Sequence, residues 1–337
     1  MAKVTDIGEF GLIERIRARK AAHNEDVVVG IGDDCAVIRR GPVLEVLTTD
    51  CLVEGSHYED GWLSMEDVGW KALAVNVSDV AAMGGVPRHA VVTLFLPLDF
   101  TTKQADELYD GLDACGEVTG VSVVGGDIVR TRGPFAVSIT LSGTCERDEV
   151  VLRSGARDGD IIVVTGSLGE ASVGLKYLRE GRVPDTGSAG EACVGKFRRP
   201  LARINESRAI VQALQPSSMI DISDGLISDL WHILDASNVG AVLEAEEIPV
   251  GQGVIDFFGG GREEALSCAV AGGEDYELLF TVESKAEARL AGIAEKLGTK
   301  LTMIGKITRK GAGVRMAGRD GESRIEKGGF DHFKPPV

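Results

Sequence analysis

Short apolar runs that end in acidic residues carry the clearest chemical meaning in this sequence. Four such runs lead into Asp33 and Asp34, Asp50, Asp127, and Asp224. Runs rich in β-branched residues and bounded by Gly or Asp are typical of buried strands, and ligands of α/β sheets lie outside the carboxyl ends of the strands. Carboxylates gathered there are costly to desolvate, and hard divalent cations with oxygen ligands would neutralise them. The pattern therefore predicts a site for several metal ions. Sites of this kind commonly bind phosphate groups.

Asp79 is the acidic residue with the most informative position. A helix is predicted over residues 64–83, opened by a capping box between Ser64 and Asp67. One face of this helix is made of Val68, Ala72, Val75, Asp79 and Ala82. A carboxylate at a core position must be paired, protonated or metal-bound. Lys71 lies on a different face, so a metal-binding role is favoured over a structural ion pair.

Further oxygen ligands and glycines accompany the acidic residues. Thr48 and Thr49 precede Asp50, and Gly125 and Gly126 precede Asp127. Two glycines allow a backbone to approach a ligand closely, although a plain turn is the alternative.

The second half of the chain offers two more acidic groups. Asp221, Ser223 and Asp224 precede an apolar helix, where Asp224 is either a helix N-cap or part of a metal–phosphate site. Glu274 lies in an acidic Gly-rich loop before a strand, and a solvated loop is the alternative there.

The usual nucleotide-binding and zinc motifs do not occur in the sequence. Gly195-Lys196 and Gly305-Lys306 are followed by Phe197 and Ile307, so no Walker A loop is formed. There is no dinucleotide fingerprint, no protein-kinase signature and no His/Cys cluster with zinc spacing. A phosphate enzyme built from this chain would therefore depend on Mg²⁺ held by carboxylates.

Strands and helices alternate along the whole chain, which favours an α/β class fold with α+β layers. A charged, Gly-containing stretch over 146–160 divides the chain into predicted domains at residues 1–148 and 149–337. The predicted helices are 10–22, 64–83, 101–118, 168–180, 203–214 and 226–236. The predicted strands include 89–96, 121–126, 135–145, 161–165, 219–222, 276–282 and 301–307.

Composition excludes several classes of function. The 337 residues carry a net charge of −16, which argues against binding to nucleic-acid phosphates. The longest apolar stretches have about ten residues, too few to span a bilayer, and the N-terminus lacks the apolar core of a signal peptide. Six cysteines occur without a CxxC pair, so reduced thiols and a cytoplasmic location are expected.

Several ordered strings together resemble the thiamine-monophosphate kinase family, in the superfamily that includes aminoimidazole ribonucleotide synthetase. The most specific string runs from Lys71 to Gly84, and the resemblance covers nearly the whole chain. The other strings are Gly8 to Ile13, Gly30 to Ala36, Thr48 to Asp50, Gly55 to His57, Gly125 to Asp127, Arg153 to Ala156, Asp221 to Leu226, Gly272 to Glu277 and Phe330 to Phe333.

This resemblance implies ATP-dependent phosphorylation of thiamine monophosphate to thiamine diphosphate by direct in-line transfer. It implies several Mg²⁺ ions held by Asp34, Thr48, Thr49, Asp50, Asp79, Asp127, Asp221 and Asp224. It places Gly126, Asp127, Arg153 and Ser223 at ATP, and His57, Glu274 and Phe330 at the thiamine substrate. Asp50, Asp127 and Arg153 would be closest to the chemistry. The family fold has two α/β domains, with metal and ATP binding and homodimer contacts in the N-terminal one.

Two alternatives to this kinase remain. A sister enzyme is the first, but the hydrogenase-maturation dehydratase would end in Cys, and selenophosphate synthetase would carry a Cys beside a Lys. This chain ends Pro336-Val337, and none of its cysteines has a neighbouring Lys. A purine-pathway synthetase belongs to the same group. The second alternative, a non-catalytic Mg²⁺ or nucleotide binder, would not need to keep the full set of carboxylates.

Overall fold

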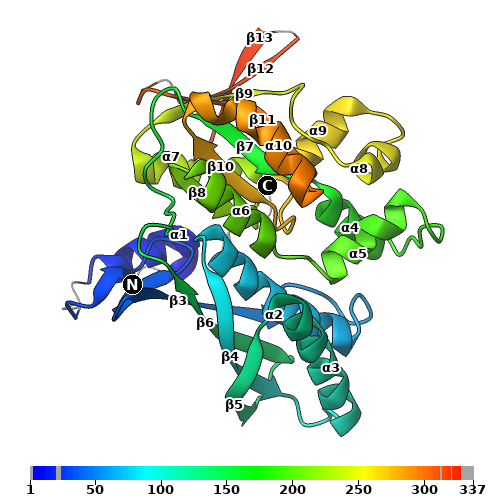
Figure 1. The fold of residues 1–337 in the computed structure, drawn as a ribbon. Helices are drawn as coiled ribbons and strands as arrows, with labels where there is room; N and C mark the ends of the chain where they lie inside the picture. The colour runs from blue at the N-terminus through cyan, green and yellow to red at the C-terminus, as the bar shows by residue number, and fades with distance from the viewer. Residues whose placement is uncertain (1–2, 20–23, 312, 320, 328–337) are drawn as a thin grey trace.

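Two β-sheets, one from each half of the chain, form the framework of the molecule (Figure 1). The structure is a computed structural model that describes residues 3–19, 24–311, 313–319 and 321–327. Strands up to Cys145 build the first sheet, and strands from Ile161 onward build the second. The fold is therefore mixed α/β, as the alternation in the sequence predicts.

The first sheet has six strands and is covered by helices on one face. Its strands, in spatial order, are β1 (Val27–Val29), β2 (Ala36–Arg40), β3 (Val43–Val53), β6 (Ala136–Cys145), β4 (Val86–Leu96) and β5 (Ser122–Arg130). Only β4 and β5 pair in parallel. Helices α2 (Met65–Ala82) and α3 (Thr102–Thr119) share one apolar core with this sheet.

Helix α2 begins as its sequence predicts. The Ser64 side chain accepts a hydrogen bond from the backbone N–H of Asp67, and the Asp67 carboxylate accepts one from the N–H of Ser64. This reciprocal pair satisfies backbone donors that have no partner within the helix. The helix ends before Gly84, whose φ of 73° favours glycine.

The second sheet has seven strands and is covered by helices on both faces. Its strands, in spatial order, are β13 (Gly321–Ile325), β12 (Val314–Gly318), β9 (Gly240–Glu244), β11 (Leu301–Thr308), β7 (Ile161–Thr165), β10 (Leu278–Val282) and β8 (Ser218–Asp221). Helix α7 (Leu226–Ser237) contributes to one apolar core, and α6 (Ile204–Leu214) and α10 (Glu287–Leu297) contribute to the other. The remaining helices are α4 (Glu170–Arg179), α5 (Ala189–Arg198), α8 (Gln252–Phe257), α9 (Arg262–Ala271) and the 3₁₀ turn η1 (Ser284–Ala286).

Helix α2 also forms the seam between the two halves. The Ser78 hydroxyl donates to Asp221 at the end of β8, at 2.5 Å. The Ser207 hydroxyl donates to the carbonyl of Ala81, also at 2.5 Å. Because one helix serves both cores, the side chains along it can meet residues from the far half of the sequence.

Three predictions from the sequence are wrong in detail. Helix α1 (Val4–Arg17) begins before the predicted residue 10, is kinked at Gly8, and ends at Arg17; residues 20–22 of the predicted helix lie outside the described part. Strands β3 and β5 continue through Asp50 and Asp127 instead of ending there. They continue because antiparallel or parallel neighbours pair with the backbone beyond these residues.

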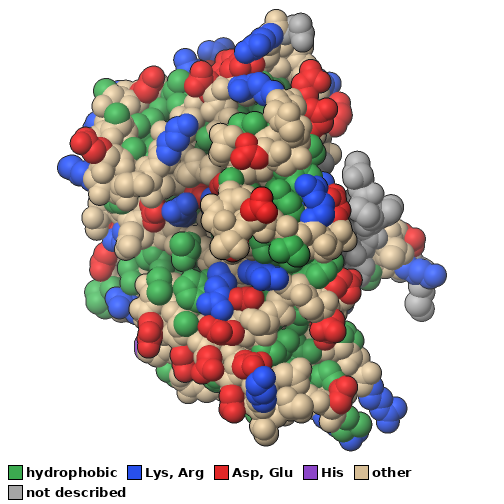
Figure 2. Space-filling view, turned by 90° about the vertical axis from the view of Figure 1, so that its right-hand side faces the viewer, with side chains coloured by type: hydrophobic (Ala, Val, Ile, Leu, Met, Phe, Trp, Pro, Cys, Tyr) green, Lys and Arg blue, Asp and Glu red, His purple; other side chains and the backbone are tan. Residues whose placement is uncertain are grey.

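Within the described residues, no helix is both long and apolar enough to cross a bilayer. Figure 2 shows acidic and basic side chains interspersed over one face, so the net charge of −16 is not gathered into a single acidic patch there.

Candidate active site

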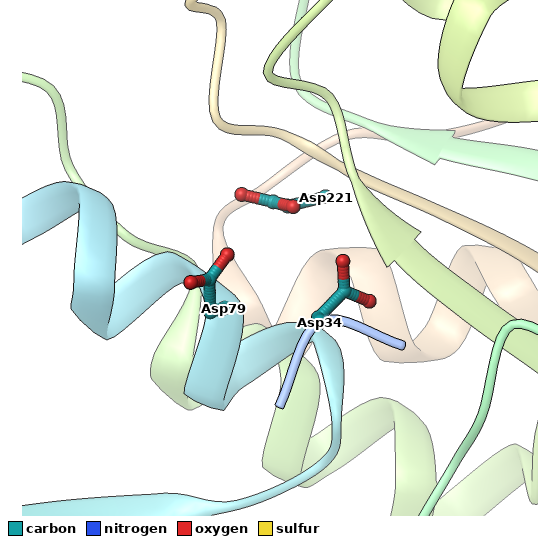
Figure 3. Close-up of side chains that lie close together, drawn as sticks. All are labelled: Asp34, Asp79 and Asp221. Atoms are coloured by element: carbon teal, nitrogen blue, oxygen red, sulfur yellow. The ribbon is translucent and has the colours of Figure 1, made fainter. Parts of the chain in front are cut away.

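Three carboxylates from three separate elements meet at the seam between the halves (Figure 3). Asp34 lies in the loop between β1 and β2, Asp79 lies on α2, and Asp221 is the last residue of β8. One oxygen from each lies within 4.8 Å of the others. This spacing suits a shared cation, because hard divalent ions take several carboxylate oxygens at once.

Hydroxyl and guanidinium groups hold these carboxylates in place. The Thr48 hydroxyl donates to Asp79 at 2.6 Å. The Arg153 guanidinium donates to Asp34 at 2.5 and 3.2 Å, and its backbone N–H donates to Asp33. The second oxygen of Asp34, Oδ2, is buried and has no hydrogen-bond partner. A buried carboxylate oxygen without a partner is an open ligand position for a cation.

The electrostatics of the cluster are those of crowded anions. Burial, followed by the charges of Asp50 and Asp221, raises the pKa of Asp79 well above its usual value. Burial and then Asp34 raise the pKa of Asp221 to about 7, although Ser78 and Arg153 oppose the rise. One guanidinium does not balance this many carboxylates, so the residues fit a site that binds metal cations.

Asp50 lies on the same face of the sheet as this cluster, and its charge acts on Asp79, whereas Thr49 lies on the other face. Side chains alternate along a strand, and Thr48 of β3 points to Asp79, so Asp50 lies on the same helix-covered face. The backbone N–H of Asp50 donates to the Asn76 side chain of α2 at 3.0 Å. Thr49 lies on the opposite face, where its hydroxyl donates to the carbonyl of Ile139 and accepts from Thr140.

Asp127 is exposed and lies on the sheet face opposite to Asp50. In the sheet ladder, Thr49 is opposite Thr140, Thr140 is opposite Val91, and Val91 is opposite Gly125, two residues before Asp127. Three interstrand steps separate β3 from β5, which amounts to about 14 Å. Within one chain, the structure therefore does not bring Asp127 to the three carboxylates.

Position 126 has no room for a side chain, because a neighbouring strand lies close to it. A Cβ at Gly126 would lie 1.9 Å from the carbonyl oxygen of Val92 in β4. The group that approaches Gly126 in this structure is the backbone of β4, whereas the predicted contact with a ligand stays a prediction.

Asp224 is not the N-cap of α7. That position belongs to Gly225, and Asp229 from the first turn accepts hydrogen bonds from the backbone N–H groups of Ser223 and Asp224, at 3.0 and 3.1 Å. The N-cap alternative for Asp224 is therefore wrong. Asp229 itself is 2% exposed and was missed; its acidic side chain in the first helical turn was the available signal.

The residues predicted at the thiamine substrate are only partly described. The Nδ1 atom of His57 accepts a hydrogen bond from the N–H of Val53 at 3.0 Å, which leaves the hydrogen on Nε2. Glu274 is not in a solvated loop, because its carboxylate contacts the Lys71 ammonium at 2.5 Å. Phe330 lies outside the described residues.

Three further polar side chains contact residues of the site: Asn76, Ser78 and Asp229. Lys71 contacts Glu274, and no pattern in the sequence had assigned any of these four residues to the site. Each acts on a group more than four residues away in the chain. The only signal in the sequence for a role of these residues in the site was that they lie in or beside acidic strings or strings of small residues.

Comparison with known proteins identifies the family. Models described as AIR synthase related protein match residues 32–145 with the N-terminal domain and residues 157–317 with the C-terminal domain. Thiamine-monophosphate kinase from Bacillus subtilis (strain 168) is 34% identical over 329 residues, covering 97% of this chain and 99% of the relative. The chain belongs to the thiamine-monophosphate kinase family.

Other members of the thiamine-monophosphate kinase family agree in sequence and structure. The enzyme of that name from Escherichia coli (strain K12) is 36% identical over 332 residues, covering 98% of this chain and 99% of the relative. A solved structure described as AaThiL complexed with AMPPCP and TMP superposes with a TM-score of 0.85 at 33% identity, covering 98% of this chain and 99% of that one.

Proposed function

We propose that this protein transfers a phosphoryl group from ATP to thiamine monophosphate and so forms thiamine diphosphate. The observation that carries the proposal is the meeting of Asp34, Asp79 and Asp221 at the seam of the two halves. Family membership supplies the substrate class, since a relative in the family has been solved with a nucleotide analogue and TMP.

The acidic cluster supports Mg²⁺ as the resident metal. Among the predicted ligands, Asp34, Thr48, Asp50, Asp79 and Asp221 lie on or around the cluster, and Asp224 follows closely after β8. When bound, Mg²⁺ would supply charge neutralisation between the phosphates and polarisation of the transferred group. The Oδ2 atom of Asp34, which has no hydrogen-bond partner, and the hydroxyl oxygen of Thr48 are ligands of the type that this ion binds.

The residues around the cluster would bind and orient the substrates. The acceptor is a phosphate monoester that is largely ionised at neutral pH, so no general base is required. Positioning and charge stabilisation do most of the work in phosphoryl transfer. Arg153 would contribute to charge stabilisation, because its guanidinium already lies at the edge of the cluster. Ser223 and Gly126 are proposed contacts of ATP, and His57, Glu274 and Phe330 are proposed contacts of the thiamine substrate.

We propose that the protein acts as a homodimer through the uncovered face of its first sheet. Ala90, Val92 and Leu94 of β4 are buried in the core under α2 and α3. Val91 and Phe95, which point to the other face, are 43% and 37% exposed. A second copy covering this face would bury these apolar side chains. Residues 1–148 would then carry the dimer contacts and residues 149–337 would complete the substrate site.

A cytoplasmic location is part of the same proposal. All six cysteines are free thiols, and four of them are buried, which suits a reducing compartment.

The decisive experiment supplies the purified protein with ATP, Mg²⁺ and thiamine monophosphate and measures thiamine diphosphate by chromatography. Formation of thiamine diphosphate with loss of ATP is expected, and EDTA should abolish it. Substrates of the sister enzymes are tested in parallel. Turnover of one of those, or binding of ATP without turnover of any, would contradict the proposal.

A further inference from the structure

Lys71 is a fully buried cation at the point where three elements meet. It lies on α2, and only 1% of its surface is exposed. Its ammonium donates to the Glu274 carboxylate at 2.5 Å and to the Phe197 carbonyl at 2.9 Å. It also lies 3.6 Å from the centre of the Phe197 ring. Such an ammonium is costly to bury unless an anion compensates it, and Glu274 is the anion that contacts it.

Glu274 is held in an unusual backbone conformation. Its φ is 68° and that of Tyr276 is 50°, values that residues with side chains adopt only when their surroundings enforce them. The backbone N–H of Glu274 donates to the carbonyl of Ser223 at 2.7 Å, and that of Tyr276 donates to the carbonyl of Ile222 at 2.8 Å. The loop carrying Glu274 therefore rests on the segment that follows Asp221.

The ion pair leaves part of Glu274 open. The Lys71 side chain is 1% exposed, whereas that of Glu274 is 26% exposed. Lys71 contacts Oε2, so Oε1 is the oxygen available to a ligand. Because the Lys71 ammonium holds one oxygen, the orientation of the Glu274 carboxylate is fixed before a ligand binds.

We propose that Lys71 is a positioning residue for the thiamine substrate: its ammonium fixes one oxygen of the Glu274 carboxylate and so holds the other oxygen toward the cationic ring of the substrate. This inference rests on the proposed function and deepens it. Lys71 acts on the substrate only through Glu274. Removing Glu274 alone leaves the buried Lys71 ammonium without its counter-ion, which is more harmful than removing both charges.

A double-mutant cycle tests the proposal. Lys71→Met keeps the length of the side chain without its charge, and Glu274→Gln keeps an acceptor for Lys71. Each single variant should raise the KM for thiamine monophosphate at least tenfold and change the KM for ATP less than threefold. The double variant should match Glu274→Gln within about twofold, because Lys71 then has nothing to position. The melting temperature of the double variant should also lie above that of Lys71→Met.

Arg208→Met is the matched control. Arg208 pairs with Glu149 and with the carbonyl of Gly84 at the other end of α2, so its loss should lower the melting temperature without changing either KM. Multiplying effects in the double variant, or equal changes in both KM values, would overturn the proposal. If Lys71→Met does not fold, Lys71→Gln, which keeps a donor for Glu274, replaces it.

The cycle also separates this inference from the proposed function. If the wild-type protein forms no thiamine diphosphate, the function is wrong, and the melting temperatures still report whether Lys71 and Glu274 are coupled. Additive losses of melting temperature in the double variant would then overturn the pairing itself.

Discussion

The Asp79 carboxylate is desolvated and lies among other carboxylates. These two features determine how its removal changes the stability of the protein. Burial and the charges of Asp50 and Asp221 disfavour its ionised form, so without metal it destabilises the fold. We predict that Asp79→Asn melts at the same or a higher temperature than the wild type in EDTA. Thermal melts with and without Mg²⁺ measure this.

The same Asp79→Asn variant should lose more activity than the roughly 10–100-fold typical of an outer-shell partner of a metal site. Asp158→Asn, a half-exposed carboxylate paired with Arg309, is the control and should keep full activity. A large drop in the melting temperature of Asp79→Asn in EDTA would mean that Asp79 is a structural partner.

His232 on α7 provides a pH-dependent contribution to stability. It packs against Phe10 of α1 with ring centres 5.2 Å apart, and burial, then the charge of Arg153, lowers its pKa to about 4. The unfolded chain takes up this proton near pH 6.5. The contribution is therefore intact above pH 6.5 and is lost as the pH falls toward 4.

Comparison of the wild type with His232→Phe at two pH values checks this. Between pH 7 and pH 5, the free energy of unfolding of the wild type should fall relative to the variant by about 2 kcal/mol. Urea denaturation measures the difference. An unchanged gap between the two proteins would show that His232 keeps its usual pKa.

At the scale of elements, the pairing of β4 with β5 depends on a single glycine. An added Cβ at Gly126 would collide with the Val92 carbonyl, whereas at Gly125 the nearest atom would be Val91 Cγ1 at 4.0 Å. We predict that Gly126→Ala lowers the free energy of unfolding by about 1–3 kcal/mol, as overpacking does. Gly125→Ala should be nearly neutral in the same urea titration. Equal changes in the free energy of unfolding for the two variants would contradict the importance of the close contact between Gly126 and Val92.

At the scale of the whole molecule, Asp50 and Asp127 lie on opposite faces of one sheet, and the proposed second copy would cover the face that carries Asp127. A second copy on the open face would meet Asp127, whereas Asp50 lies on the helix-covered face with the acidic cluster. We predict that Asp50→Asn and Asp127→Asn are each folded and nearly inactive. A one-to-one mixture of the two variants, after subunit exchange, regains about a quarter of wild-type activity only if one site takes Asp50 and Asp127 from different copies, because each heterodimer then has one intact site.

Light scattering on the same samples checks the assembly directly. A mass near the 35.6 kDa of one chain would reject the homodimer. A dimeric mass with no recovery of activity in the mixture would show that each copy builds its site alone.

Local patterns in the sequence determined the elements and the chemical type of the site. The capping box at Ser64, the helical periodicity through Asp79 and the Gly and Asp boundaries of the strands depend on residues only a few positions apart. They predicted α2, most other helices and strands, and a carboxylate-rich site. Boundaries failed at β3 and β5, because a strand ends where its neighbours stop pairing with it, and those neighbours are distant in the chain.

Only the tertiary structure decided which of these residues meet. Strand alternation separates Thr49 from Asp50, and sheet order places Asp127 about 14 Å from Asp50, three interstrand steps away. Lys71 contacts Glu274 across a separation of 203 residues in the chain. Ser78 contacts Asp221 across a separation of 143 residues. A one-dimensional pattern contains no register and no packing of one half on the other, so it shows which residues can bind cations but not which of them share one site.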